Sequence, residues 1–65
     1  MNNEAPPSRA DRGARIDRRM RVLGVSQRQL AEHLGMSRTT VGKAVDGDEG
    51  VLERNLKKIE SGLAE

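Results

Sequence analysis

A short stretch in the middle of the chain carries side chains that could hydrogen-bond to the edges of DNA bases. On a helix over residues 38–46, four residues would share the face opposite the apolar one: Arg38, Thr39, Gly42 and Lys43. A guanidinium such as that of Arg38 pairs bidentately with guanine O6 and N7, and Thr39 could contact a base edge or a thymine methyl. Lys43 could reach a base or a phosphate. Gly42 has no side chain and would let the helix backbone sit close to the DNA.

Four neighbouring residues are candidates for phosphate contacts: Gln27, Arg28, Ser37 and Thr40. Gln27 stands at the start of a helix expected over residues 27–34, and a helix N-terminus favours a bound phosphate. For each charged candidate the alternative is an ordinary solvated position on a helix surface. The surrounding motif favours DNA contact for Arg38, Thr39 and Lys43, whereas for Arg28 the two interpretations balance.

Two short helices must position these side chains, and both have start and stop signals. Ser26 and Ser37 can cap their N-termini, and Gln29 completes a capping box with Ser26. Gly35 and Gly47 stand where a left-handed residue would end each helix. Six apolar residues would point inward if the helices crossed steeply: Leu30, Leu34, Met36, Val41, Ala44 and Val45. Two helices joined by a short turn that contains glycine predict a helix-turn-helix.

Residues 27–47 resemble the helix-turn-helix of the phage-repressor and Cro class of DNA-binding proteins, an XRE-like family. The matching positions are Gln27, Ala31, Gly35 and Val41. The segment 51–63 looks like the helix that closes the core in that family, so the resemblance covers residues 10–63. It implies an all-α fold, a compact lambda-repressor-like bundle of four short helices that contains the helix-turn-helix.

The resemblance also implies roles for two of the candidate residues. The glutamine at the start of the first motif helix, here Gln27, touches the DNA backbone in this family and supports the first residue of the recognition helix. Some relatives carry a second glutamine where this chain has Arg38. The pairing of two glutamines is therefore absent, and the base preference should differ.

A helix is expected on each side of the motif, over residues 9–23 and 51–63. The first has an apolar stripe at Ile16, Met20 and Leu23, with Gly13 expected to fray its early turns. The last has a stripe at four positions with helical spacing: Leu52, Leu56, Ile59 and Leu63. Residues 1–8 are expected to be a disordered tail, and residues 9–65 to form the DNA-binding domain.

Composition excludes several classes of protein. With 65 residues, no aromatic residue, no cysteine and one histidine, the chain makes at most one small domain without a disulfide or metal site. The residues contain no catalytic set, so we expect no enzyme, cofactor or small-molecule substrate. The acidic residues Asp46, Asp48 and Glu49 do not match a calcium loop and are better interpreted as a solvated turn. No membrane span or signal peptide is present, which favours the cytoplasm of a bacterium or a phage-infected host.

Charge is unevenly distributed around a net value of +2. Residues 1–28 hold seven arginines against three acidic residues, and residues 46–65 hold six acidic residues against three basic ones. The basic segment 1–28 ends at the start of the helix-turn-helix, where the protein would have to contact DNA phosphates. A pI of about 9.7 agrees with binding to nucleic acid.

The leading hypothesis is a sequence-specific regulator of transcription that binds double-stranded DNA, similar to phage repressors and Cro. A symmetric homodimer would read half-sites about 34 Å apart, although the sequence leaves monomer and dimer open. One alternative is a protein-interaction module, antitoxin-like or anti-repressor-like, and another is the DNA-targeting domain of a longer recombinase. Under any of these hypotheses we expect the chain to be either a minimal regulator or the N-terminal piece of a longer protein.

Overall fold

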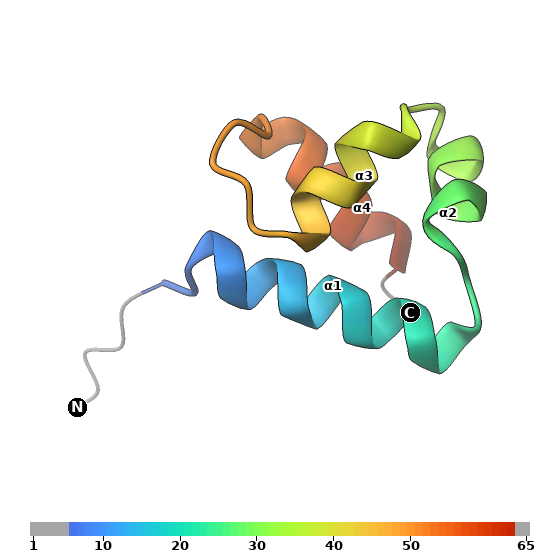
Figure 1. Cartoon of the computed structure of the whole chain (residues 1–65), viewed down its shortest axis with the longest axis horizontal. Coiled ribbons are helices and arrows are strands. Elements are labelled where there is room, and N and C mark those ends of the chain that lie inside the picture. The colour runs from blue at the N-terminus through green and yellow to red at the C-terminus, as the bar shows by residue number, and fades with distance from the viewer. Residues whose placement is uncertain (1–5, 64–65) are drawn as a thin grey trace.

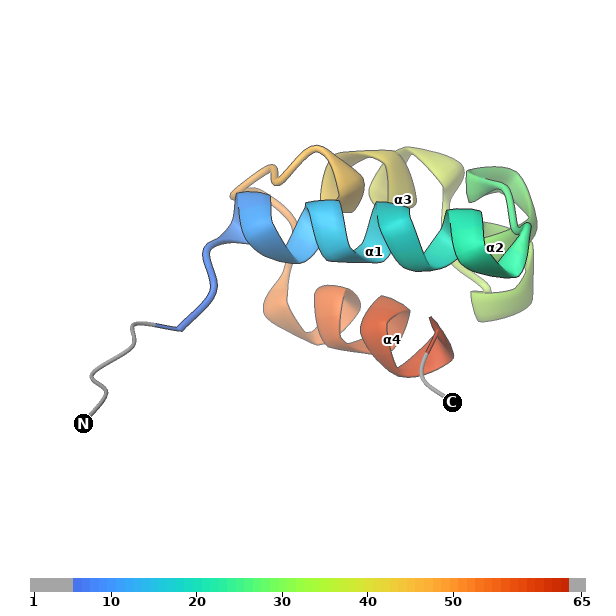
Figure 2. The ribbon, with the colours of Figure 1, turned by 90° about the horizontal axis from the view of Figure 1, so that it is seen from below.

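The computed structural model describes residues 6–63 and folds them into helices alone (Figure 1). The elements are α1 (Arg9–Leu23), α2 (Gln27–Leu34), α3 (Arg38–Val45) and α4 (Glu53–Leu63). α3 packs on both α1 and α2, and α4 packs on the same two helices. Seen along the direction of Figure 2, α1 runs across the molecule with α3 on one side and α4 on the other. The all-α bundle of four helices is confirmed.

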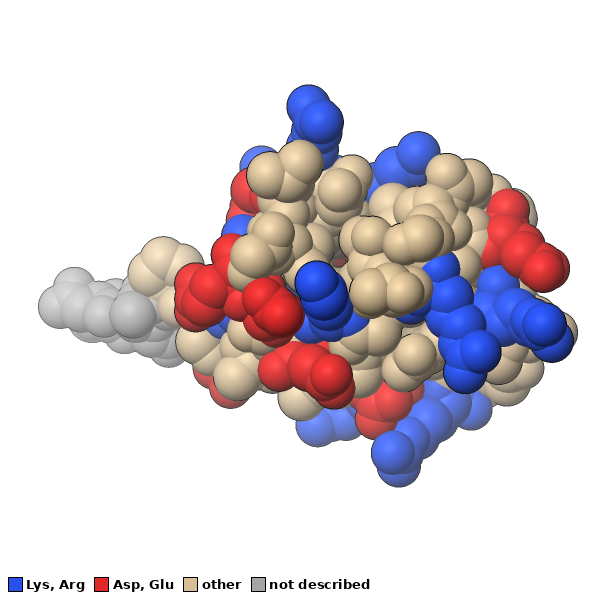
Figure 3. Space-filling view, turned by 45° about the horizontal axis from the view of Figure 1, so that its top comes forward, with Lys and Arg blue, Asp and Glu red and all other residues tan. Residues whose placement is uncertain are grey.

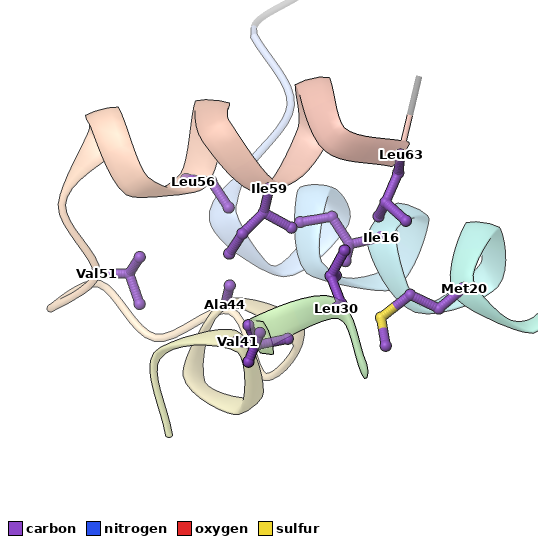
Figure 4. Close-up of a cluster of buried hydrophobic side chains, with 10 residues drawn as sticks. Ile16, Met20, Leu30, Val41, Ala44, Val51, Leu56, Ile59 and Leu63 are labelled. Carbon is purple, nitrogen blue, oxygen red and sulfur yellow. The ribbon is translucent and has the colours of Figure 1, made fainter. Parts of the chain in front are cut away.

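One cluster of aliphatic side chains forms the core (Figure 4). Its ten buried members come from all four helices and from one loop: Ile16, Met20, Leu30, Ala31, Val41, Ala44, Val51, Leu56, Ile59 and Leu63. Leu56, Ile59 and Leu63 lie at helical spacing on α4 and point toward α1, α2 and α3. α4 therefore closes the core, as the sequence pattern predicts.

The ends of α1 and α2 fall where the sequence predicts, because local signals determine them. The Ser8 hydroxyl accepts a hydrogen bond from the Asp11 backbone N–H at 3.1 Å and caps α1. α1 ends at Gly24, whose φ of 69° lies in the left-handed region. The expected disordered tail falls mostly on residues 1–5, which lie outside the described residues, and Pro6 and Pro7 are exposed.

The predicted start of α4 is wrong by two residues. The helix begins at Glu53, and the Leu52 carbonyl accepts its first hydrogen bonds, from Asn55 and Leu56 at 3.0 Å each. Val51 lies before the helix in a turn, where its N–H donates to the Asp48 carbonyl at 3.3 Å. This turn directs Val51 into the core, 5% exposed, and leaves Leu52 53% exposed. The apolar stripe of α4 therefore begins at Leu56.

The predicted end of α3 is wrong by one residue. The helix ends at Val45, and Asp46 is its C-cap rather than its last residue. The chain leaves the helix through Gly47, whose φ is 77° and whose N–H donates to the Ala44 carbonyl at 3.1 Å. The glycine thus acts at the position that the sequence predicts, and the cap residue precedes it.

Gly13 lies where α1 packs against the end of α3. It is buried, and a β-carbon built on it would stand 2.5 Å from the Ala44 carbonyl oxygen and closer still to that of Val45. The absence of a side chain lets α1 touch the end of α3 backbone to backbone. Fraying at this glycine stays a prediction, and the close contact between the helices is a feature that the sequence pattern does not reveal.

Candidate nucleic-acid interface

The turn between α2 and α3 is built from backbone hydrogen bonds and side-chain caps. α2 begins with a full capping box, since the Ser26 hydroxyl accepts from the Gln29 N–H at 3.1 Å and the Gln29 side chain accepts from the Ser26 N–H at 2.9 Å. It ends at Gly35, with a φ of 69°, and the Met36 N–H donates to the Ala31 carbonyl at 3.0 Å. These bonds fix the direction in which α3 leaves the turn.

One face of α3 is buried and the other is open to solvent. Val41 and Ala44 lie in the core, at most 2% exposed. Arg38, Thr39 and Lys43 are exposed on the other side, and within residues 6–63 none of the three makes a side-chain hydrogen bond or an ion pair. Their donors are therefore available to an outside partner.

Ser37 and Thr40 are joined to each other at the start of α3. The Ser37 hydroxyl caps the helix by accepting from the Thr40 N–H at 3.1 Å, and the two hydroxyl oxygens lie 2.9 Å apart. Whichever hydroxyl donates to the other, one hydroxyl hydrogen remains for an external acceptor. The pair can thus cap the helix and still donate to a phosphate.

Gln27 and Gly42 bring the start of α2 against the middle of α3. A β-carbon at Gly42 would stand 3.2 Å from the Gln27 side-chain oxygen, so this half-buried glutamine lies directly beside the glycine. Arg28, the next residue, is exposed. The structure thus brings together Gln27 with Gly42 and Ser37 with Thr40. Arg28, Arg38, Thr39 and Lys43 are exposed side chains without such a partner among residues 6–63.

Three arginine side chains of α1 form hydrogen bonds within the protein and so have partners there. Arg12 donates to both carboxylate oxygens of Glu60, at 2.9 and 2.7 Å, and to Glu53 at 3.1 Å. Arg9 donates to the Val51 carbonyl at 2.7 Å, and Arg19 donates to the Leu63 carbonyl at 3.1 Å. These three arginines therefore brace α1 against α4 and the loop before it.

The ion pairs shift the pKa values of their members. Hydrogen bonds from Arg12 hold the pKa of Glu60 and that of Glu53 below the ordinary value, against a smaller opposing effect of desolvation. The two carboxylates in turn raise the pKa of Arg12, Glu60 more than Glu53. The cluster is charged at neutral pH and serves the packing of α1 on α4.

The acidic residues after α3 form an exposed turn. The Asp48 carboxylate accepts a hydrogen bond from the Gly50 N–H at 2.7 Å, and Asp46 and Glu49 are exposed. In Figure 3 most acidic side chains lie toward the end of the molecule that carries this loop, whereas basic side chains dominate the opposite end. Among residues 6–63 no group of histidines and carboxylates could hold a metal ion.

Sequence reasoning missed the residues that hold α1 in place. Gly13, Arg9 and Arg12 contact residues more than 30 positions away along the chain, and no local pattern signals such contacts. The one available signal was a glycine inside a helical pattern, which can mark a close packing contact as well as a weak turn.

Comparison with known protein families gives a match. A family model described as the bacteriophage CI repressor helix-turn-helix domain matches residues 14–59 of the 65, which include all of α2 and α3. No curated protein and no solved structure matches the chain. Within residues 6–63, none of the helices has the length and apolar character that crossing a membrane requires.

Proposed function

The chain belongs to the family of bacteriophage CI repressor helix-turn-helix domains, and from this premise we propose that it is a sequence-specific regulator of transcription, similar to phage repressors and Cro. α3 enters the major groove of double-stranded DNA, as the second helix of this motif does. The chain acts in the cytoplasm of a bacterium or of a phage-infected host. Two copies bind as a symmetric homodimer to half-sites about 34 Å apart.

The observation that carries this proposal is the division of α3 into two faces. Val41 and Ala44 fix the helix in the core, while Arg38, Thr39 and Lys43 point outward without partners among residues 6–63. Polar side chains without partners on a firmly held helix suit the reading of base edges. A helix surface with no binding role also exposes charged residues, and the family membership supports DNA reading over that alternative.

Each candidate residue has a role in this proposal. Arg38 pairs with guanine O6 and N7, Thr39 contacts a neighbouring base edge or thymine methyl, and Lys43 reaches a base or a phosphate. Gly42 leaves space for the groove wall beside the Gln27 side chain. Four residues near the helix N-termini contact phosphates: Gln27, Arg28, Ser37 and Thr40.

The test is a binding selection from a library of random DNA duplexes, sequenced after several rounds. An enriched inverted repeat supports a dimeric regulator and gives the half-site spacing. A single short asymmetric site supports a monomeric reader and contradicts the homodimer. Weak, salt-sensitive binding without enrichment contradicts sequence-specific recognition altogether.

The protein-interaction alternative would be favoured by an exposed apolar patch on α4. The large apolar residues of α4 are instead buried, since Leu56, Ile59 and Leu63 are at most 5% exposed. The exposed large apolar residues within 6–63 are Val22 and Leu23 at the end of α1 and Leu52 before α4. No observation therefore favours this alternative over DNA binding.

A further inference from the structure

The C-terminal end of α3 rests directly on the backbone of α1. A β-carbon at Gly13 would stand 2.5 Å from the Ala44 carbonyl oxygen and closer to that of Val45, although real β-carbons essentially never approach another atom within 3.0 Å. A second backbone contact lies just beyond the end of α3, where a β-carbon at Gly47 would stand 2.8 Å from the Ala10 Cα atom. The two segments therefore touch along their backbones, with no side chain between them to absorb a change.

Arg9 adds a third contact between α1 and the chain that follows α3. Its guanidinium donates to the Val51 carbonyl at 2.7 Å and to the Asp48 carbonyl at 3.5 Å. One turn further along α1, Arg12 holds both carboxylate oxygens of Glu60 on α4. α1 is thus anchored to α4 on one side and supports the end of α3 on the other.

We propose that Gly13 is a positioning residue for base readout, because it sets the depth and tilt at which α3 lies on the domain. This inference rests on the proposed function of α3. The obstacle to a side chain at Gly13 is a pair of helix carbonyl oxygens, which cannot rotate away as a side chain can. Any β-carbon there pushes α1 and the end of α3 apart.

Such a push tilts α3 rather than carrying the whole motif with it. The N-terminal end of α3 is held by the turn at Gly35 and Ser37, and α2 packs on α4. The displaced end carries Lys43, directly before Ala44 in the chain. A binding surface must be held within about 0.5 Å of its productive geometry, and the separation that Gly13→Ala demands is of that order.

The contribution to base reading can be separated from a contribution to folding. A variant that only destabilises the domain loses affinity for every DNA by the same factor, namely its loss of folded fraction. A variant that tilts α3 loses affinity for the preferred sequence more than for others, since phosphate contacts depend less on sequence. The ratio of the two affinities is therefore the quantity to measure.

The experiment uses the duplex enriched from the random library and a scrambled duplex of the same length, with binding followed by fluorescence anisotropy of labelled DNA. Gly13→Ala is compared with wild type and with Gly62→Ala, the matched control. At Gly62 the nearest atom to a new β-carbon is the end of the flexible Leu34 side chain, at 2.7 Å, and α3 is not involved. We expect Gly13→Ala to lower the affinity ratio about tenfold and Gly62→Ala to preserve it.

A Gly13→Ala protein that keeps the wild-type ratio within twofold overturns the inference, as does an equal loss of ratio in Gly62→Ala. If wild type itself does not distinguish the two duplexes, the proposed function fails and the inference falls with it. Arg9→Gln serves where Gly13→Ala does not fold, because it removes the bonds to Val51 and Asp48 without adding volume. The ratio of its affinities for the preferred and the scrambled duplex should fall at least about twofold. An unchanged ratio would contradict the inference that α1 supports α3.

Discussion

The side-chain oxygen of Gln27 lies so close to Gly42 that a β-carbon on the glycine would come within 3.2 Å of it. The two residues belong to different helices, Gln27 to the first turn of α2 and Gly42 to the middle of α3. The candidate phosphate-binding end of α2 and the candidate reading face of α3 are thus one continuous surface. A substitution at Gly42 should therefore affect both the end of α2 and the face of α3.

Gly42→Ala should change stability and DNA binding in opposite directions. Alanine favours the helix by about 1 kcal/mol over glycine, and the flexible Gln27 side chain can move away from the new methyl group. The same methyl stands where the groove would approach, which should weaken binding to the preferred duplex by about 1–3 kcal/mol. Circular dichroism during thermal unfolding measures the change in stability, and binding titrations measure the change in DNA affinity. A loss of both stability and affinity would contradict the assigned role.

Arg38→Ala should cost about 1–3 kcal/mol of binding to the preferred duplex and relax the preference at one base. Arg15→Ala is the matched control, since Arg15 is also exposed but borders a recess between α1 and α4 with Glu60 and Leu63. A repeat of the library selection with each variant gives the comparison. Equal binding by Arg38→Ala and wild type would show that another residue reads that base.

Arg28→Ala should weaken binding to all duplexes by a similar factor, because a phosphate contact carries no sequence information. The slope of log affinity against log salt should become shallower by about 1. Titrations of the preferred and the scrambled duplex at several salt concentrations measure both effects. An unchanged slope would place Arg28 among the ordinary solvated residues of α2.

Val51→Ala should destabilise the domain by about 1.5–3 kcal/mol, whereas Leu52→Ala should change it by less than about 0.5 kcal/mol. The difference follows from burial, 5% exposed for Val51 against 53% for Leu52. Urea unfolding of both variants measures it. The reverse order would mean that α4 begins at Val51, as the apolar spacing alone suggests.

Acid should weaken the contact between α1 and α4. Arg12 lowers the pKa of Glu60 and of Glu53 in the folded protein below the ordinary 4.5. Stability from these carboxylates is therefore fully present above pH 4.5 and is lost as pH falls through the lower, folded-state pKa values. Glu60→Gln should cost at most about 1 kcal/mol at pH 7 and should lose less stability than wild type between pH 5 and pH 3. Parallel pH profiles of unfolding for the two proteins would rule out this contribution.

The sequence predicts the parts of the fold that local chemistry determines. Ser26 with Gln29, and Gly24 and Gly35 with their left-handed conformations, act within one or two turns, so the bounds of α1 and α2 can be predicted from them. The start of α4 has no such signal, because Leu52 has no side-chain acceptor to cap the helix. A perfect apolar stripe from Leu52 to Leu63 therefore suggested a start that the structure does not have.

The candidate site was predictable to the extent that it follows from one helix. The exposed position of Arg38, Thr39 and Lys43 follows from which side of α3 is apolar, and a helical period is enough to find it. Contacts between distant segments were not predictable. The approach of Gly13 to Val45 and the pairing of Arg12 with Glu60 join residues 32 and 48 positions apart, and depend on the complete packing of the bundle.

The brevity of α2 and α3 ties their shape to that of the whole domain. Each has eight residues, fewer than the roughly 12–15 at which an isolated helix becomes marginally stable in water. Both depend on the single core that α1 and α4 complete. Heat that unfolds the domain should therefore abolish DNA binding in the same transition, and bound DNA should raise the melting temperature in return. The fraction of protein bound to DNA should therefore follow the fraction that is folded as temperature rises.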